Sequence, residues 1–364
     1  MLVFSQDGCS TMTTRNNKKN QMRERFEFIK EELNNPIKKA VRMQKMSNFA
    51  TSILRAVIIF GLAFIILYPI IQQFAIAFRD PIDLNNPLVQ WIPETPSVIN
   101  FQISGAILKY GQSLFNNIKV SAICTVLQVA CTALAGYAFA RLRFKGINIF
   151  FVCVLATLII PPQAVSLSRM LYFENFDILG FFERLTGSAL KMTGVGKDYV
   201  MYITSATGQG IRAGLFVYIF RQFFRGIPIE LEESAQIDGA GIIRTFWSVM
   251  LPNARGAIIT CALFAFVWQW NDVYYTQLYK ISGATFPLMS MRLVNSAELV
   301  WTLMGQLEYA HLKDMIGEEV NGNPLFNQTV VNTASLMMML PLLIGYLFVQ
   351  RLFIEGVERS GIVG

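Results

Sequence analysis

The sequence predicts an all-α polytopic membrane protein with six transmembrane helices, and three observations support this. Hydrophobic residues make up 53% of the 364 positions and charged residues only 15%, compared with about 25% charged residues in typical soluble domains. The mean hydropathy is accordingly positive, at +0.43. Several uncharged runs are each long enough to cross about 30 Å of hydrocarbon. Basic residues gather between alternate runs, as they do in the cytoplasmic loops of membrane proteins.

The first three predicted spans lie in the N-terminal half. Ala56–Phe78 holds 23 residues without a charge. The run Val120–Ala140 follows and ends in a short basic turn, Arg141–Lys145. Gly146–Ser168 is the third run, and Pro161 with its neighbouring proline interrupts it. Because proline inside a helix removes a hydrogen bond and clashes with the preceding turn, we expect the third span to be broken there.

The other three predicted spans are Tyr199–Phe220, Gly256–Leu278 and Thr329–Val349. The first of them contains Arg212, and a charge at the bilayer centre costs roughly 2.5–3.5 kcal/mol on insertion scales. Arg212 is therefore expected to face a partner helix or a watery cavity. The alternative is that the span is shifted along the chain, which would leave Arg212 nearer one surface.

The basic residues predict the orientation. With the N-terminus inside, the cytoplasmic segments 1–55, 141–145, 221–255 and 351–359 hold 20 of the 31 Lys and Arg residues. Both termini and the loop 227–252 would then face the cytoplasm, following the positive-inside rule. The net charge of +7 is explained by this topology, so it does not call for a nucleic-acid partner.

Residues 1–50 form a predicted cytoplasmic N-terminal extension, and residues 51–364 the transmembrane domain. The extension begins without an apolar run, so we expect no secretory signal peptide. Within it, Gln21–Leu33 places apolar residues on one helical face with basic residues around them. This pattern is typical of an interfacial helix on the inner leaflet. A solvated extension is an equally good interpretation.

The loop 227–252 is a polar, helix-prone island between two hydrophobic segments. Pro228 suits the first turn of a helix, and three following glutamates complement the positive end of the helix dipole. These are Glu230, Glu232 and Glu233. We expect this helix to end at Gly239, and its small residues would allow a close approach to another backbone. A second helix, Ile242–Leu251, is predicted to stop before Pro252.

The spacing within this loop resembles the cytoplasmic loop of binding-protein-dependent ABC importer permeases. Their pattern is Glu-Ala-Ala, three residues, Gly, nine residues, then Ile-x-Leu-Pro. Here Glu233-Ser234-Ala235 precedes Gly239 by the same interval, and Val249–Pro252 ends the pattern. Asp238-Gly239-Ala240 is similar to the form found in the sugar-transporting branch. The resemblance makes this a coupling loop for an ATPase, with these expected coupling residues: Glu233, Ser234, Ala235, Asp238, Gly239, Ala240, Leu251 and Pro252.

The resemblance covers roughly residues 50–364. The runs Gly136–Arg141, Phe220–Phe224 and Trp270–Asp272 are similar to the second permease subunit of maltose-type sugar importers. This implies a type I ABC importer permease core in the bacterial cytoplasmic membrane. It also implies three kinds of partner, namely a sister permease subunit, a cytoplasmic ABC ATPase dimer and an extracytoplasmic sugar-binding protein.

No nucleotide cofactor is expected on this chain. A phosphate-binding loop of the form Gly-x-x-x-x-Gly-Lys-Ser/Thr is missing from the sequence. Gly194-Val195-Gly196-Lys197 is followed by aspartate and lacks the first glycine, so we interpret it as a turn. ATP would be bound by the partner ATPase, and alternating access would be driven from there.

Five polar residues at membrane depth are candidates for the substrate path: Gln128, Gln163, Gln269, Asn271 and Asp272. Sugars carry many hydroxyl groups and need such donors and acceptors. The same residue types also form hydrogen bonds between transmembrane helices, and this alternative is favoured.

The sequence therefore predicts a permease subunit of an ATP-driven, binding-protein-dependent importer of a sugar or oligosaccharide. An importer of another small solute with the same architecture is an alternative. An ATP-independent secondary transporter is another, although a carboxylate deep in a span is missing apart from Asp272. An enzyme or metal site is not expected, because the chain has one histidine, His311, and no Cys-x-x-Cys pair among its five cysteines.

Overall fold

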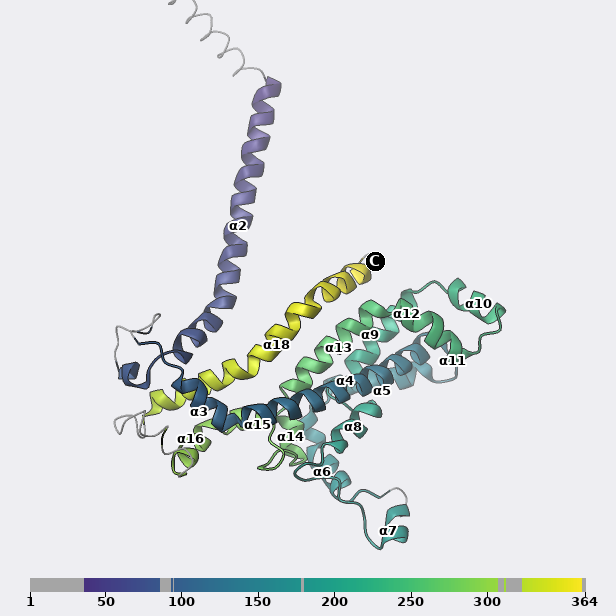
Figure 1. Ribbon diagram of the computed structural model, residues 1–364. Coiled ribbons are helices and arrows are strands. Elements are labelled where there is room, and N and C mark those ends of the chain that lie inside the picture. Colours follow the sequence, from purple (N-terminus) through teal and green to yellow (C-terminus); the bar gives the residue numbers. More distant parts are fainter. Residues whose placement is uncertain are drawn as a thin grey trace, which may run out of the picture. The chain divides into compact units, whose positions relative to one another are not determined.

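The computed structural model describes residues 36–85, 93, 95–177, 180–306, 311 and 323–361 (Figure 1). Within these ranges the regular structure is helical, with two isolated β-bridges. The predicted interfacial helix at Gln21–Leu33 lies outside the described residues. Contacts divide the chain into two units, Met1–Ile71 and Gln72–Gly364, which are considered separately.

Helix α2 (Pro36–Ala77) supplies the described part of the first unit and runs on into the second. It is longer than the predicted span Ala56–Phe78 and passes the predicted domain boundary at residue 50 without a break. Pro36 opens it, where the missing N–H is tolerated, and good helix formers continue it. Its apolar stretch, Met43–Ala77, is long and apolar enough to cross a membrane.

Helix α4 (Tyr110–Arg141) is the central element of the second unit. It follows η1 (Pro81–Asn85) and α3 (Ile99–Leu108), and it packs against α8, α9 and α13 (Figure 1). Gly136 allows the close approach of α9, because a Cβ atom there would lie 2.5 Å from Phe220 Cβ. The predicted second span, Val120–Ala140, lies inside α4.

The third predicted span is broken, as the prolines indicate. Helix α5 (Ile147–Ile159) is followed by η2 (Pro162–Val165) and α6 (Ser166–Glu174). The two halves are bent by 101°. Helix α7 (Phe181–Thr186) follows.

The fourth predicted span, Tyr199–Phe220, is not a single helix. Helix α8 (Tyr199–Ala206) ends, and α9 (Ala213–Gly226) begins after a linker, 207–212. Positive φ angles at Gly208 (+74°) and Arg212 (+54°) interrupt the helix. The Arg212 guanidinium lies 4.6 Å from the Trp268 ring centroid on α13. Of the two interpretations for this arginine, the structure favours the one in which it faces a partner helix.

The loop between α9 and α13 contains α10 (Glu230–Ile237), α11 (Ile242–Thr245), a π-helical turn η3 (Phe246–Met250) and α12 (Leu251–Asn253). The prediction that the second helix stops before Pro252 is wrong, because the helical path continues to Asn253. Wider π turns relax the register of the backbone hydrogen bonds, which accommodates a residue without an N–H. The path then bends by 80° into α13 (Arg255–Trp270).

The fifth predicted span, Gly256–Leu278, ends early, because α13 stops at Trp270 and a separate helix α14 (Tyr274–Leu278) follows. Helices α15 (Met289–Val294) and α16 (Ser296–Met304) come next. Helix α18 (Pro324–Gly361) contains the whole sixth predicted span. In the described part of the chain, three helices (α2, α4 and α18) are long and apolar enough to cross a membrane, and the number rises to five spans if each bent pair counts as one.

Candidate coupling loop and polar sites between the helices

Helix α10 ends in a Schellman motif, which explains the position of its glycine. The Gly239 N–H donates to the Gln236 carbonyl at 3.0 Å, and the Ala240 N–H donates to the Ala235 carbonyl at 2.9 Å. Gly239 has a φ of +80°, whereas a Cβ atom added there would meet nothing within 4 Å. Glycine is thus needed for the backbone conformation, and no atom of this chain competes for the space.

The predicted coupling residues lie on both faces of the loop. Ala235 is buried against the body of the chain, whereas Glu233, Ser234, Asp238, Gly239 and Pro252 are exposed. Ala240 and Leu251 are half-buried, and Leu251 packs against the core cluster around Phe246 and Met250. The exposed group is available to another molecule, and the buried group holds the loop in place.

Glu232 anchors α10 to α4, a role that the sequence reasoning missed. The Tyr137 hydroxyl donates to Glu232 Oε1 at 2.8 Å, and Arg141 Nε lies 3.4 Å from Glu232 Oε2 as an ion pair. Both partners come from the last turns of α4, four residues apart and therefore on one helix face. Arg141 also donates through Nη2 to the Ile227 carbonyl at the start of the loop. The sequence feature that could have pointed to this anchor is the Gly136–Arg141 run, because it contains both partners of Glu232.

An aromatic core supports this anchor. The Tyr137 ring lies 5.2 Å from the Phe246 ring centroid and 5.8 Å from that of Phe224. Phe220, Phe224 and Met250 are fully buried in the same cluster. The core joins α4, α9 and the η3 turn, so the Tyr137 side chain that holds Glu232 is itself held by three elements.

Five large apolar side chains of the loop are exposed to solvent or to a partner, and we refer to them together as the loop docking face. Ile237 is 86% exposed, Ile243 74% and Trp247 61%. Leu231 and Ile242 complete the set, with 42% and 56% exposure.

Gln128 is satisfied within the protein. Its side chain is buried, and its amide donates to the carbonyl of Ile211 at 2.6 Å. Gly210 makes room for it, because a Cβ atom there would lie 2.7 Å from Gln128 Oε1. This contact ties α4 to the linker between α8 and α9, in line with a helix-packing role.

Asp272 also has a local role, as the cap of α14. Its carboxylate accepts hydrogen bonds from the N–H groups of Tyr275 (3.1 Å) and Thr276 (2.9 Å). The Thr276 hydroxyl donates to it as well, at 3.0 Å. These bonds satisfy free N–H groups at the start of a helix.

The remaining three candidates lie in different surroundings. Gln163 in η2 and Asn271 are exposed, and the Asn271 amide donates to the Val267 carbonyl of its own helix at 2.9 Å. Gln269 is buried and its amide points to Met201 Sδ at 3.4 Å. The structure does not gather the five candidates into one cluster.

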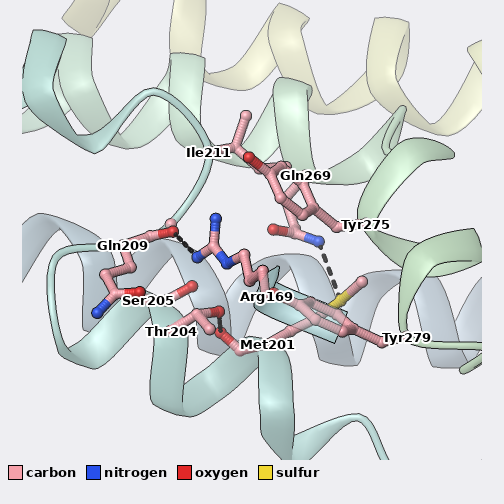
Figure 2. Close-up of a pocket in the computed structure, with 10 residues that line it drawn as sticks. Arg169, Met201, Thr204, Ser205, Gln209, Ile211, Gln269, Tyr275 and Tyr279 are labelled. Carbon is pink, nitrogen blue, oxygen red and sulfur yellow. Dashed lines mark hydrogen bonds between the residues drawn. The ribbon is translucent and has the colours of Figure 1, made fainter. Parts of the chain in front are cut away.

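Gln269 lines two small cavities, each of about 10 Å³. One is shared with Asp272. The other, shown in Figure 2, contains Arg169 from α6 together with Tyr275 and Tyr279. Arg169 was absent from the predicted substrate path because the predicted third span ends at Ser168, which placed Arg169 in the outer segment that follows.

Comparison with known proteins identifies the family. Residues 132–358 match the binding-protein-dependent transport system inner membrane components. The chain belongs to this family. The matched range includes the loop from α10 to α12. This is a family of transport components and not of enzymes. Together with the apolar helices of the described residues, the match makes the chain a multi-pass component of the inner membrane.

Three relatives illustrate the similarity. The alpha-glucoside transport system permease protein AglG of Rhizobium meliloti is 31% identical over 51% of this chain and 45% of its own length. The match therefore spans about half of that relative. The arabinooligosaccharides transport system permease protein AraQ of Halalkalibacterium halodurans is 27% identical over 83% of this chain and 93% of its own length.

The third relative is a solved structure. It is the crystal structure of a bacterial ABC transporter involved in the import of the acidic polysaccharide alginate. It aligns with a TM-score of 0.60 and 20% identity over 84% of this chain and 98% of that chain. The likeness establishes the fold, which is the type I ABC importer permease core that the sequence predicts.

Proposed function

We propose that this chain is the transmembrane permease subunit of an ATP-driven, binding-protein-dependent importer of a sugar or oligosaccharide. The observation that carries the proposal is the α10 loop, which has an exposed docking face and a buried anchor to α4. It lies inside the region that matches the family. The names of AglG and AraQ, which refer to alpha-glucosides and arabinooligosaccharides, support a saccharide as the transported solute.

The energy would come from a separate ATPase, because this chain lacks a phosphate-binding loop. The loop docking face and the exposed carboxylate of Glu233 would seat in a cleft of the ATPase. When two ATPase subunits close on ATP, they would pull α10. The anchor between Glu232 and α4 would pass that movement to the helices packed around α4. A rigid-body switch between inward-open and outward-open states would follow.

The remaining partners follow from the same reasoning. Two permeases are required to enclose a path between them, so a sister subunit is proposed. An extracytoplasmic binding protein would deliver the sugar and favour one state of the switch, which makes transport directional. The distribution of basic residues supports a cytoplasmic location for α10 and for both termini.

The substrate path on this chain is proposed to run past α13 and η2. Gln163 and Asn271 are exposed candidates for contacts with hydroxyl groups. Tyr274 holds η2 against α14, since its hydroxyl donates to the Pro162 carbonyl at 3.1 Å. Gln128 and Asp272 are committed to contacts within the chain, so we assign them to helix packing.

A pull-down of the tagged chain in mild detergent tests the proposal. We expect an ABC ATPase and a second permease to co-purify, and the complex in liposomes to take up oligosaccharide only with ATP and binding protein. A chain that purifies alone and transports solute without ATP would contradict the proposal.

A further inference from the structure

Arg169 is a cation without a carboxylate partner in the polar cavity between α6, α8, α13 and α14 (Figure 2). Its Nη2 donates to the Gln209 carbonyl at 2.6 Å, and its guanidinium lies 5.1 Å from the Tyr275 ring centroid. It takes part in none of the ion pairs between described residues. An ionisable residue within the membrane domain marks a functional site by default.

Nearby acidic groups are engaged elsewhere. Glu174, on the same helix as Arg169, pairs with Lys191 at 3.0 Å. The carboxylate of Asp272 accepts hydrogen bonds from the first turn of α14. Among the described residues, neither of these carboxylates forms an ion pair with the Arg169 guanidinium.

Two donors that reach this cavity are buried and unused. Arg169 Nε is buried and makes no hydrogen bond. Tyr279 is only 1% exposed, and its hydroxyl makes no hydrogen bond of normal geometry to the described residues, although it lies close enough to the Arg169 side chain to interact with it. Buried polar groups are normally paired, so each exception requires an explanation such as a ligand or water. Both groups line one cavity, so a single oxygen atom placed there can accept a hydrogen bond from each of them.

Gln269 provides a third polar group on the cavity wall. Its amide contacts only the sulfur of Met201 in the described part of the chain, at 3.4 Å, and a thioether is a weak acceptor. The amide can therefore turn to a better partner at small cost.

The opposite wall is unwound backbone. Gln209, Gly210 and Ile211 line the cavity from the linker between α8 and α9. At membrane depth, irregular backbone occurs where it is buried in protein or lines a cavity that water can enter. The cavity volume of about 10 Å³ is roughly that of one water-sized probe. It accommodates an oxygen of a ligand, while the rest of a sugar ring must remain outside.

We propose that Arg169, Tyr279 and Gln269 bind an oxyanion of the transported solute, so that the importer accepts saccharides or polyols with a carboxylate or phosphate group. This inference rests on the proposed import function. A neutral hydroxyl would satisfy Tyr279 and Gln269, but it would offer the guanidinium only a neutral acceptor. An oxyanion satisfies all three residues, and its hydrogen bonds with arginine are about twice as strong as those between neutral groups.

The test uses the chain purified with its ATPase and sister permease in nanodiscs. Dissociation constants are measured by ligand-detected NMR titration with digalacturonate, glycerol 3-phosphate and the neutral disaccharide cellobiose. We expect at least one anionic probe to bind more tightly than cellobiose. Arg169→Gln should weaken that probe by about tenfold or more and leave cellobiose unchanged. Arg169→Lys should weaken it less, and Tyr279→Phe by several-fold.

Arg212→Gln is the matched control. It removes the same charge from the neighbouring linker, where the guanidinium lies over Trp268 outside this cavity, and it should leave all three dissociation constants unchanged. Tight binding of digalacturonate alone identifies a carboxylate ligand, and tight binding of glycerol 3-phosphate alone identifies a phosphate ligand.

Three results would overturn the inference. They are equal binding of anionic and neutral probes to the wild type, an equal loss for all probes in Arg169→Gln, and an unchanged anion affinity in Tyr279→Phe. If Arg169→Gln fails to assemble, the anion affinity of Tyr279→Phe provides the test. ATP-dependent uptake of a neutral saccharide by the same complex separates the two proposals. If uptake persists without anion selectivity, only this inference fails, and if uptake needs no ATP, the proposed function fails.

Discussion

Replacing Tyr137 with phenylalanine tests whether the loop is anchored through Glu232. The change removes one hydroxyl and keeps the ring that packs between Phe224 and Phe246. Among the described residues, the hydrogen bond that it deletes is the one of 2.8 Å to Glu232 Oε1. Because Glu233 and the loop docking face are untouched, binding of the ATPase should persist while transmission of its movement is weakened.

The structure sets the size of the effect. A hydrogen bond to a charged group contributes about 1.5–3 kcal/mol, which corresponds to roughly a 10- to 150-fold change in an equilibrium constant. Arg141 remains 3.4 Å from the Glu232 carboxylate, so no buried charge is left without a partner. We therefore expect the lower half of this range for the local opening of α10.

Two assays measure the effect. Hydrogen exchange of the amides in α10 reports its local opening, and uptake per ATP hydrolysed in liposomes reports coupling. Exchange should become faster and uptake per ATP should fall, with normal co-purification of the ATPase.

The control for Tyr137→Phe is Tyr202→Phe, which deletes a hydrogen bond of the same kind, from the Tyr202 hydroxyl to Asp198 at 2.6 Å. It should leave exchange in α10 unchanged. If Tyr137→Phe changes neither exchange nor uptake per ATP, the anchor does not have the role assigned to it.

Three further substitutions separate conformation, packing and docking. Gly239→Ala should destabilise the end of α10 by about 1–2 kcal/mol because of the positive φ at this position, and it should reduce ATPase co-purification. The control is Gly241→Ala, where φ is −71° and a Cβ atom would meet nothing within 4 Å. This variant should have neither effect. Gly136→Ala should destabilise the packing of α4 on α9 by about 1–3 kcal/mol, because its Cβ would lie 2.5 Å from a side-chain atom of α9. Gly111→Ala has nothing within 4 Å, so its thermal unfolding should match the wild type. Glu233→Gln should leave thermal unfolding unchanged and weaken ATPase co-purification, and unaltered co-purification would refute a docking role for this exposed carboxylate.

The sequence predicted those features that depend on neighbouring residues. Apolar runs located α2, α4 and α18, because the cost of placing charges in lipid acts on each segment separately. The two prolines predicted the break after α5, and the loop spacing predicted a helix that needs glycine at position 239. In each case the physical cause lies within a few residues of its effect.

Other features depend on helices that meet only in the folded chain. The division between α8 and α9 is stabilised by Gln128, which donates to Ile211 from 83 positions away. Arg212 and the glycines of this segment are local signals of an irregular span, but they do not show where the helix ends. Glu232 is one of three glutamates in a helix start, and its partner Tyr137 lies 95 positions earlier.

The sequence by itself therefore determined the class of protein, most of the apolar spans and the coupling-loop motif, because hydropathy, helix capping and spacing are local properties. Only the tertiary structure decided which glutamate anchors the loop, which polar residues are used for helix packing, and that Arg169 faces unpaired donors in a cavity. These outcomes depend on which side chains become neighbours when α4, α6, α13 and α14 pack together. Burial then makes pairing obligatory for some groups and leaves a few others free to bind a ligand.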